Sequence, residues 1–380
     1  MLDSIQLSVL MGAVPAPVPR FLLDSLAEVE VTAKDEGTTG FQLTFSIDKQ
    51  SPLQTLFVLT GSQPLLFMRV VLVTTVNGVA NVLIDGVITT NQLSPGDRGS
   101  NSTLTLTGED LTAVMNQSNA SGSPFPSAPV EGRVAQILGK YAAFGIMPVI
   151  IPSVMTDEVM PIERVPSQKG TDLAYIRLLA KQVGYVFFLT PGPLPGMSQA
   201  YWGPQIKMGP IQPALSSDMD AYTNVESLHF TFDQQKNKNP VTYSSAMATG
   251  AGTSIPVPPI TSLNPLLGLV APMATNATRP DLTPFRDDLA KRPVPELMMI
   301  GLAAAAENAE AISCDGSLDV TRYGGVLMAR QLVGVRGAGP AFDGLFYVKS
   351  VTHHIKRGSY KQNFTLTRNA LGSSVPAVTP

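Results

Sequence analysis

The feature that most constrains the fold is a strand–loop–strand pattern that occurs twice, at residues 85–111 and 343–371. Each copy starts with Asp-Gly, which favours a turn, and its second strand ends in Thr-Leu-Thr, at 105–107 and 365–367. The first strand of the later copy is rich in aromatic and β-branched residues. Chance similarity between β-rich segments is one explanation, but a duplicated β-domain is the better interpretation.

Alternating residues predict further strands in the first third of the chain. Phe41, Leu43, Phe45 and Ile47 alternate with polar residues over 40–47, as in a half-buried strand. Asn77-Gly78, between apolar runs, is a strong hairpin signal. We therefore predict a first β-domain of about six strands over residues 1–108, with residues 1–20 as an extended lead-in. The expected strands are 26–34, 40–47, 65–76, 79–90 and 102–107.

The next segment, 109–222, is predicted to be a smaller α/β domain. Its clearest helix is 171–183, where Thr171 can cap the N-terminus and Gly184 can end the helix. The strand Tyr185 to Leu189 should follow, and 191–222 is rich in loop residues. The other expected elements are helices at 109–115 and 131–144 and a buried strand at 147–151.

Strand patterns return at residue 223 and predict a second β-domain from 223–245 and 312–371. Residues 225–232 alternate, with Leu228, Phe230 and Phe232 inward, and Val241-Thr242-Tyr243 is the expected next strand. Residues 246–311 are predicted to be a Pro/Ala-rich arm followed by a helix at 295–311, and 372–380 a tail. The irregular part, 246–294, is expected to be ordered by contacts between chains.

Composition indicates an assembled protein. Charged residues make up only 14% of the 380 residues, which is too few to cover a large monomer. The net charge of −3 predicts no specific nucleic-acid partner. No membrane span is expected, because the apolar stretch 64–76 is interrupted by Arg69. The first residues lack the basic region of a secretory signal.

Histidines, acidic pairs and a glycine-rich segment are the candidate site residues of the sequence. His353 and His354 are adjacent in a strand and so point to opposite faces, which disfavours a shared metal even with His229. The acidic pairs are more typical of solvated turns or helix N-termini than of glycosidase carboxylates. They are Glu109-Asp110, Asp157-Glu158 and Asp287-Asp288.

The glycines of GVRGAGPAFDG also fail as a nucleotide site. Gly334, Gly337 and Gly339 match neither the P-loop nor the dinucleotide spacing, so a turn between strands is expected. Cys314, the single cysteine, has no base in view and is predicted to be buried or half-buried. We therefore assign no catalytic, cofactor-binding or metal-binding residue and predict that the chain is not an enzyme.

One long segment carries a family resemblance. SLDVTRYGGVLMARQLVGVRGAGPAFDGLFYVKSVTHHIKRGSYKQNFTLTR, within 313–372, resembles the late control protein D family. These are baseplate hub proteins of contractile phage tails and contractile injection systems, similar to the hub part of valine-glycine-repeat spike proteins. The helix–Gly–strand segment TDLAYIRLLAKQVGYVFFL resembles the second domain of the same family.

The resemblance implies a mainly β fold with an α+β insert. It implies two tail-tube-like β-barrel domains and a smaller helix-containing domain, assembled as a homotrimeric ring in a virion or injection-particle baseplate. Such a hub ends the sixfold inner tube and adapts it to a threefold spike. Because the sequence stops at Pro380, about nine residues after Leu371, the spike is expected to be a separate protein.

Other partners implied by the resemblance are the tail tube protein, baseplate wedge or adaptor proteins, and a tape-measure protein in the lumen, with assembly in the bacterial cytoplasm. Two other functions stay open from the sequence. A tail-associated cell-wall hydrolase needs a cleft with paired carboxylates or Cys/His, which the residues do not indicate. A carbohydrate-binding adhesin needs exposed aromatic platforms, and Trp202 is the only tryptophan.

Overall fold

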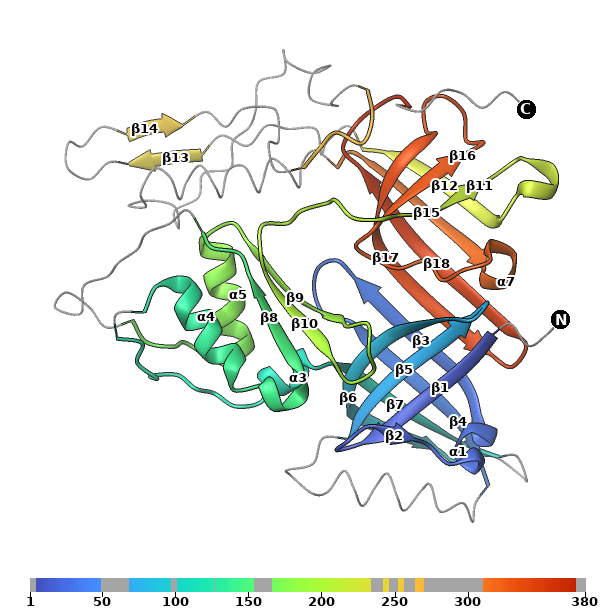
Figure 1. Ribbon diagram of the computed structural model, residues 1–380, viewed down its shortest axis with the longest axis horizontal. Coiled ribbons are helices and arrows are strands. Elements are labelled where there is room, and N and C mark those ends of the chain that lie inside the picture. Colours follow the sequence, from blue (N-terminus) through green and yellow to red (C-terminus); the bar gives the residue numbers. More distant parts are fainter. Residues whose placement is uncertain are drawn as a thin grey trace.

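A computed structural model shows a mainly β protein, as predicted (Figure 1). It contains a 13-stranded sheet, a three-stranded sheet with helices, and a two-stranded hairpin. No helix among the described residues is long and apolar enough to cross a membrane. The residues that the structure describes are 5–48, 68–96, 101–126, 128–153, 166–233, 242–245, 252–255, 264–269 and 310–373.

The first half of the large sheet comes from the N-terminal third of the chain. Its strands lie in the order β3-β4-β7-β6-β5-β1-β2. Asn77 and Gly78 form the predicted turn between β5 and β6 with positive φ angles of 49° and 81°. The elements are β1 (Ile5–Gly12), β2 (Ala16–Pro17), α1 (Arg20–Ser25), β3 (Leu26–Lys34), β4 (Gly40–Ile47), β5 (Arg69–Val76), β6 (Val79–Ser94) and β7 (Ser102–Asp110).

The second half repeats this strand order. Along the sheet, β12-β15-β18-β17-β16 corresponds to β3-β4-β7-β6-β5 of the first half. β11 takes the place of β1, but it runs parallel to β16, whereas β1 runs antiparallel to β5. The corresponding strands also follow one another in the same order along the chain. The elements are β11 (Ile211–Ser216), η2 (Asp220–Tyr222), β12 (Val225–Phe232), β15 (Ile312–Asp319), α7 (Val320–Tyr323), β16 (Leu332–Arg336), β17 (Gly344–Lys356) and β18 (Ser359–Arg368).

A bulge in each long hairpin aligns the two halves. The β6–β7 register shifts at Thr89 and the β17–β18 register shifts at Lys349. These two bulge residues are 260 positions apart, and the same offset relates each residue of β6 to its counterpart in β17. Asp85 therefore corresponds to Leu345, and not to Asp343 as the repeated Asp-Gly indicates. The sequence repeat is out of register with the structural repeat by two residues.

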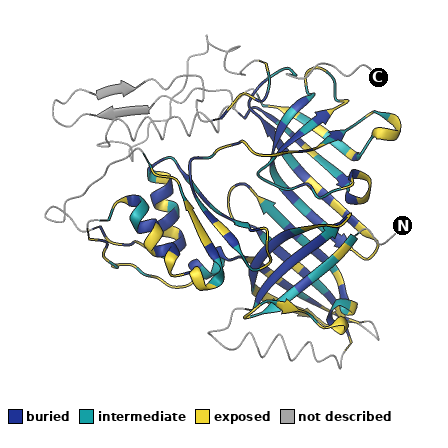
Figure 2. Cartoon of the chain, in the orientation of Figure 1, coloured by how far each residue is buried: buried dark blue, intermediate teal, exposed yellow. Residues whose placement is uncertain are grey.

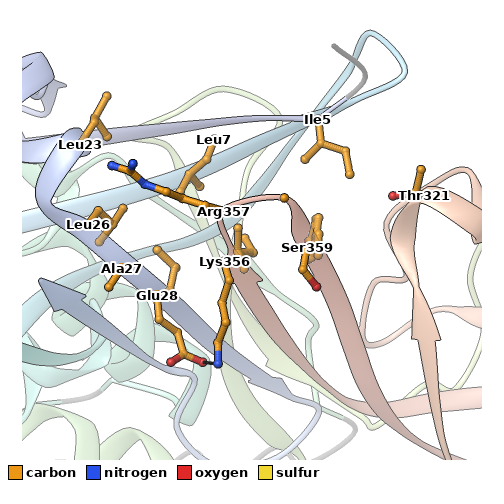
Figure 3. A pocket seen from close by; sticks show the side chains of 14 residues that line it. Ile5, Leu7, Leu23, Leu26, Ala27, Glu28, Thr321, Lys356, Arg357 and Ser359 are labelled. Atoms are coloured by element: carbon orange, nitrogen blue, oxygen red, sulfur yellow. Dashed lines mark ion pairs between the residues drawn. The ribbon is translucent and has the colours of Figure 1, made fainter. Parts of the chain in front are cut away.

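The two halves join in one open sheet, which corrects the prediction of two barrels. β3 pairs with β4 on one edge and with β17 on the other. Since both edges of β3 are occupied, β1 cannot pair with it to close a barrel. No closed barrel occurs among the strands that the structure describes. A pocket lies beside the gap between β1 and β3 (Figure 3), and one apolar core runs under both halves.

The smaller unit has a sheet in the order β8-β10-β9, with helices packed against it. Thr171 caps α5 as predicted, its Oγ1 accepting from the Ala174 N–H at 3.2 Å. The strand β8 was predicted to be buried, but Met147 and Val149 are exposed because β8 is an edge strand. The elements are α3 (Thr112–Met115), α4 (Val130–Gly139), η1 (Ala142–Phe144), β8 (Ile146–Ile150), α5 (Asp172–Gln182), β9 (Val186–Pro191) and β10 (Ser198–Gly203).

Some strands differ from the predictions. The lead-in contains β1, and the loop-rich segment 191–222 contains β10 and β11; β11 pairs with β16 of the large sheet. β13 (Thr242–Ser245) is not the next strand of the second half, since it pairs with β14 (Gly252–Ile255) in a hairpin of its own. Short strands whose pattern is broken by proline, as in β11, give too weak an alternation to be recognised. The helix predicted at 295–311 lies outside the described residues, apart from its last two.

Candidate functional site: the polar face of the large sheet

One face of the large sheet is polar across eight strands, from β12 to β6. The cross-strand partners show it, because residues directly opposite each other lie on one face. Figure 2 shows the resulting alternation of buried and less buried residues along the strands. We call this set the polar face: Ser227, His229, Thr231, Ser313, Asp315, Ser317, Lys361, Asn363, Thr365, Ser350, Thr352, His354, Lys356, Glu28, Glu30, Thr32, Gln42, Thr44, Ser46, Thr103, Thr105, Thr107, Thr90, Gln92 and Ser94.

The polar face continues without a break across the seam between the halves. At the seam, the Thr32 and Thr352 hydroxyls are 3.2 Å apart. Beside them the Lys356 ammonium lies 3.1 Å from Glu28. Small hydroxyl side chains and paired charges keep this surface hydrated without a strong field of either sign. Such a surface suits the wall of a water-filled passage.

The opposite face of the same strands is buried. His353 is 1% exposed there, and its Nδ1 lies 2.8 Å from the Tyr360 hydroxyl. Burial lowers the pKa of His353 to about 3, so this imidazole is neutral at physiological pH. His354 lies on the polar face, 3.7 Å from Glu30, and thus the two histidines point to opposite faces as predicted.

The remaining candidate residues do not form a reactive cluster in the described part of the chain. No group of three His, Cys, Asp or Glu there could hold a metal. Glu109 is exposed whereas Asp110 is buried, where it accepts from the Thr112 N–H at 3.0 Å. Asp157-Glu158 and Asp287-Asp288 lie outside the described residues.

The glycine segment connects two strands. Gly337 has a φ of +81°, and a Cβ there would lie 1.8 Å from the Ser217 carbonyl oxygen, so only glycine fits. The Ala338 N–H donates to Asp343 at 2.8 Å and closes the turn. Cys314 is fully buried, and burial raises the pKa of its thiol to about 12. Such a thiol is not a nucleophile at neutral pH.

A buried ion pair holds the α/β unit against the first half of the sheet. The Arg69 guanidinium donates to both Asp85 oxygens, at 2.7 and 2.6 Å. It also donates to the carbonyls of Phe144 and Gly196, at 2.8 and 2.9 Å. We call Arg69 and Asp85 the ion-pair contact. In the sequence, Arg69 interrupts an apolar run and does not point to this contact. The signal is a lone charge within a buried strand, with an acid on the next strand.

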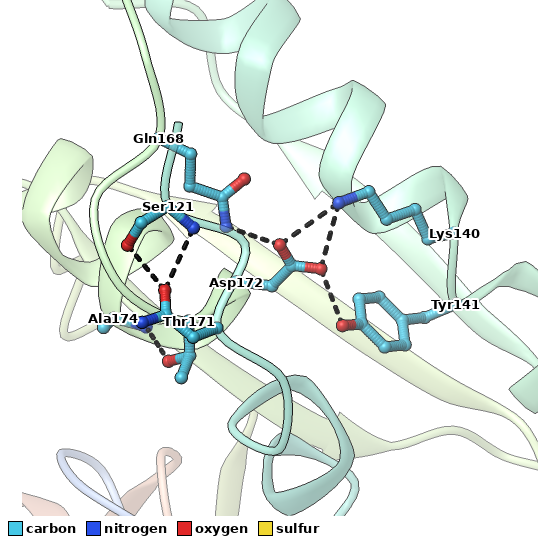
Figure 4. A network of polar contacts seen from close by, with 8 residues as sticks. Ser121, Lys140, Tyr141, Gln168, Thr171, Asp172 and Ala174 are labelled. Atoms are coloured by element: carbon cyan, nitrogen blue, oxygen red, sulfur yellow. Dashed lines mark hydrogen bonds and ion pairs between the residues drawn. The ribbon is translucent and has the colours of Figure 1, made fainter. Parts of the chain in front are cut away.

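Inside the α/β unit, a polar network fixes the start of α5 (Figure 4). Asp172 is buried and accepts from the Tyr141 hydroxyl at 2.7 Å, from the Gln168 amide at 2.6 Å and from the Lys140 ammonium at 3.2 Å. Burial and this carboxylate raise the pKa of Tyr141. The Asp172 carboxylate is satisfied by these three neighbours, whereas the Gln168 amide oxygen is buried without a partner. The network ties a loop to two helices.

Trp202 packs inside the same unit. It is fully buried and lies edge-on to Tyr185 at a centroid distance of 4.9 Å. A tryptophan in this position cannot serve as an exposed platform for a sugar ring. Trp202 is therefore not one of the exposed aromatic platforms that the adhesin hypothesis requires.

The polar face ends in two strand edges with half-exposed apolar residues on the buried side. Leu93 of β6 is 39% exposed and Phe232 of β12 is 38% exposed. With the offset of 260 residues, Leu93 corresponds to His353 in the second half, and His353 is 1% exposed. β3 lies beside His353, whereas no described strand lies beside Leu93 on that edge.

Known structures share this architecture over nearly the whole chain. The tail protein from Neisseria meningitidis MC58 superposes with a TM-score of 0.60 at 13% identity, covering 96% of this chain and 97% of that one. The 43 kDa tail protein of prophage MuSo2 from Shewanella oneidensis also gives 0.60, at 14% identity, covering 97% and 100%. The chain has the fold of phage tail proteins.

A secretion-system protein is also similar. A chain of the Francisella PdpA–VgrG complex superposes with a TM-score of 0.56 at 7% identity, covering all of this chain and 60% of that one. Neither a known family model nor a curated protein sequence matches the chain. The structural neighbours agree with the predicted relation to tail and VgrG-like proteins, and at these identities they establish the fold.

Proposed function

We propose that the chain is a structural baseplate hub of a phage tail or related injection particle. Three copies form a ring that ends the inner tube and carries a separate spike. The observation that carries this proposal is the repeated strand order within one continuous sheet. Two equivalent halves per chain make six equivalent units per trimer, which matches a sixfold tube on one side and a threefold spike on the other.

The seam inside the chain is a template for the contact between copies. At the seam, Thr352 and His354 of β17 pair with Thr32 and Glu30 of β3. β6 corresponds to β17, and β12 corresponds to β3. Gln42 pairs with Glu30 in the first half and Asp315 pairs with His229 in the second half, so Glu30 and His229 occupy equivalent positions. The edge of β6 in one copy therefore pairs with the edge of β12 in the next.

The same correspondence predicts the register between copies. Gln92 lies opposite Thr231 of the next copy, and Ser94 lies opposite His229. All four belong to the polar face, so the face continues around the ring and lines its lumen. Pairing also covers Leu93 and Phe232 and removes two open strand edges, which otherwise invite uncontrolled association.

A disulfide-trapping experiment tests this register. Under oxidation, a variant carrying Gln92→Cys and Thr231→Cys should give covalently linked rings with the mass of three chains, measured by light scattering and non-reducing electrophoresis. Each single variant should give none, and the buried Cys314 provides no competing thiol. Absence of cross-links at concentrations where three-chain particles exist would contradict the register, and six copies in an imaged particle would contradict the trimer.

A second experiment removes the contact instead of trapping it. Leu93→Asp and Phe232→Asp should each convert the ring to monomers, because each places a charge in the apolar part of the interface. Leu194→Asp is the matched control, since Leu194 is 60% exposed and lies on the α/β unit. The proposed role needs no catalytic group, so purified protein should not degrade peptidoglycan.

A further inference from the structure

The seam between the two halves contains a pocket that the assembly described above does not use. It has a volume of about 340 Å³, at the small end of the range for specific ligand sites. Strand β1 and helix α1 of the first half form one side of the pocket, and the turn between β17 and β18 forms the other (Figure 3). A cavity of this size accommodates one or two large side chains.

The floor of the pocket is apolar and comes from both halves. Leu26 and Val29 of β3 lie beside Ile355 of β17 and Tyr360 of β18, and all four are buried. Leu7 of β1 is partly exposed at the wall. Because the floor is assembled from strands that are already packed, the pocket is preformed, and an entering apolar side chain gains burial without reorganisation.

The rim of the pocket is basic. Glu28 balances Lys356 at 3.1 Å, whereas Arg357 donates only to the backbone carbonyl of Asp24 and has no acidic partner in the described part of the chain. Figure 3 shows its side chain extending along the pocket toward Leu23. A guanidinium with most of its donors unused favours a carboxylate ligand.

A strand edge beside the pocket can hold an extended chain. β1 pairs with β5 along its length, but on its other edge β2 pairs only with Leu10 and Met11. Residues 5–8 therefore have no strand partner on that edge among the described residues. An added strand would fill the gap that keeps the first half from closing, with alternate side chains turned toward the pocket.

We propose that this pocket binds an extended segment of another protein, which carries a large apolar residue and, two positions later, an Asp or Glu. The segment pairs with residues 5–8 of β1. Its apolar side chain enters the pocket over Leu26 and Ile355, and its carboxylate binds Arg357. Charge complementarity at Arg357 and the open edge of β1 select such a segment over an apolar ligand without charge.

Titration of the full-length protein with a defined peptide tests this. The probe is Ac-Thr-Thr-Leu-Thr-Asp-Thr-Thr-NH2, followed by methyl NMR shifts of Ile5 and Ile355. We expect saturable shifts, with affinity reduced about fivefold when Asp is replaced by Asn in the peptide. Replacing Leu by Ala in the peptide should abolish the shifts at Ile355.

Variants of the protein identify the residue responsible. Arg357→Gln should bind the Asp and Asn peptides equally, whereas the exposed Arg336→Gln on β16 should keep the difference. Absence of saturable shifts, or an Asp preference that persists in Arg357→Gln, would overturn the proposal. Equal shifts with decanoate would assign the pocket to a lipid chain and also overturn it.

Ring formation is measured on the same samples, so the two proposals are tested separately. Arg357→Gln should leave the mass of the assembled ring unchanged, because Arg357 lies at the seam within a chain and not at the edges of β6 or β12. A photo-cross-linker at Leu23 should not link two copies. Copy-to-copy cross-links there would show that a second copy fills the pocket and would overturn the proposal of a different partner.

Discussion

Corresponding positions in the two halves of the large sheet hold their neighbours by opposite chemistry. In the first half, Arg69 and Asp85 form the buried ion-pair contact that binds the α/β unit. By the bulge alignment Asp85 corresponds to Leu345. Arg69 corresponds to Leu332, because Arg69 pairs with Val87 as Leu332 pairs with Tyr347. The two leucines pack with Tyr347 and Leu267, a group that we call the apolar contact.

The two contacts differ because the α/β unit and the 264–269 segment place different groups against the sheet. The α/β unit presents two backbone carbonyls, of Phe144 and Gly196, which need donors when buried. The segment at 264–269 presents the Leu267 side chain, which needs only apolar surface. The same two strand positions therefore accept either an ion pair or two leucines. The segment that packs against them determines which pair is suitable.

The largest effect is expected from breaking the ion-pair contact. Arg69→Ala leaves the Asp85 carboxylate buried without its partner, and we expect a loss of about 3–5 kcal/mol in the free energy of unfolding, measured by urea denaturation. Arg69→Leu with Asp85→Leu, which copies the second half, should recover part of that loss. A loss below about 1 kcal/mol for Arg69→Ala would show that the pair is not desolvated as described.

Weakening the apolar contact should cost less. Leu332→Ala removes a buried side chain and leaves a cavity, so we expect a loss of about 2–4 kcal/mol in the same assay. The loss caused by Leu332→Ala should not change with salt concentration, because the apolar contact contains no charge, unlike the ion-pair contact. If Leu332→Ala is as harmless as a change of the exposed Ile211, the apolar contact does not bind the 264–269 segment.

The buried His353 makes the stability of the second half depend on pH, whereas the corresponding Leu93 of the first half does not titrate. His353 has a pKa of about 3 when folded against about 6.5 when unfolded, so the unfolded chain takes up the proton first. Its stabilising contribution is complete above pH 6.5 and falls by about 1.4 kcal/mol per pH unit below it. His353→Leu, which copies Leu93, should remove this slope in urea titrations between pH 5 and 7.

The histidine next to it is the control. His354→Gln changes an imidazole on the polar face and should leave the slope of the parent protein intact. A slope that persists in His353→Leu would assign the pH dependence to another group.

The smallest effect is expected at the seam on the polar face. Lys356 and Glu28 are partly exposed, so a double-mutant cycle with Lys356→Ala and Glu28→Ala should give a coupling of at most about 1 kcal/mol. The coupling should decrease at high salt. A larger value would mean that the pair is shielded from water, as in a narrow lumen.

Much of the local structure could be predicted from the chain itself. Alternation over 40–47 predicted β4 to the residue, and Asn77-Gly78 predicted its hairpin. Thr171 predicted the start of α5. These signals are local: a turn needs a positive φ, a helix end needs an acceptor, and a half-buried strand needs alternating side chains.

The candidate site was less accessible to sequence reasoning. Adjacent His353 and His354 were correctly expected on opposite faces, but nothing near Arg69 in the sequence points to Phe144 or Gly196. The partner groups are backbone carbonyls 75 and 127 residues away. A carbonyl carries no residue signature, so its donor cannot be inferred from composition.

The sequence by itself determined that each strand has one polar and one apolar face, because side chains alternate whichever neighbour the strand has. Only the tertiary structure decided that β3 pairs with β17 and that the two halves become one open sheet, in which no described strand covers the outer edges of β6 and β12. Pairing between strands uses backbone groups that all residues share. It is selected by the fit of the whole sheet and core, a property of the folded chain that no single segment encodes.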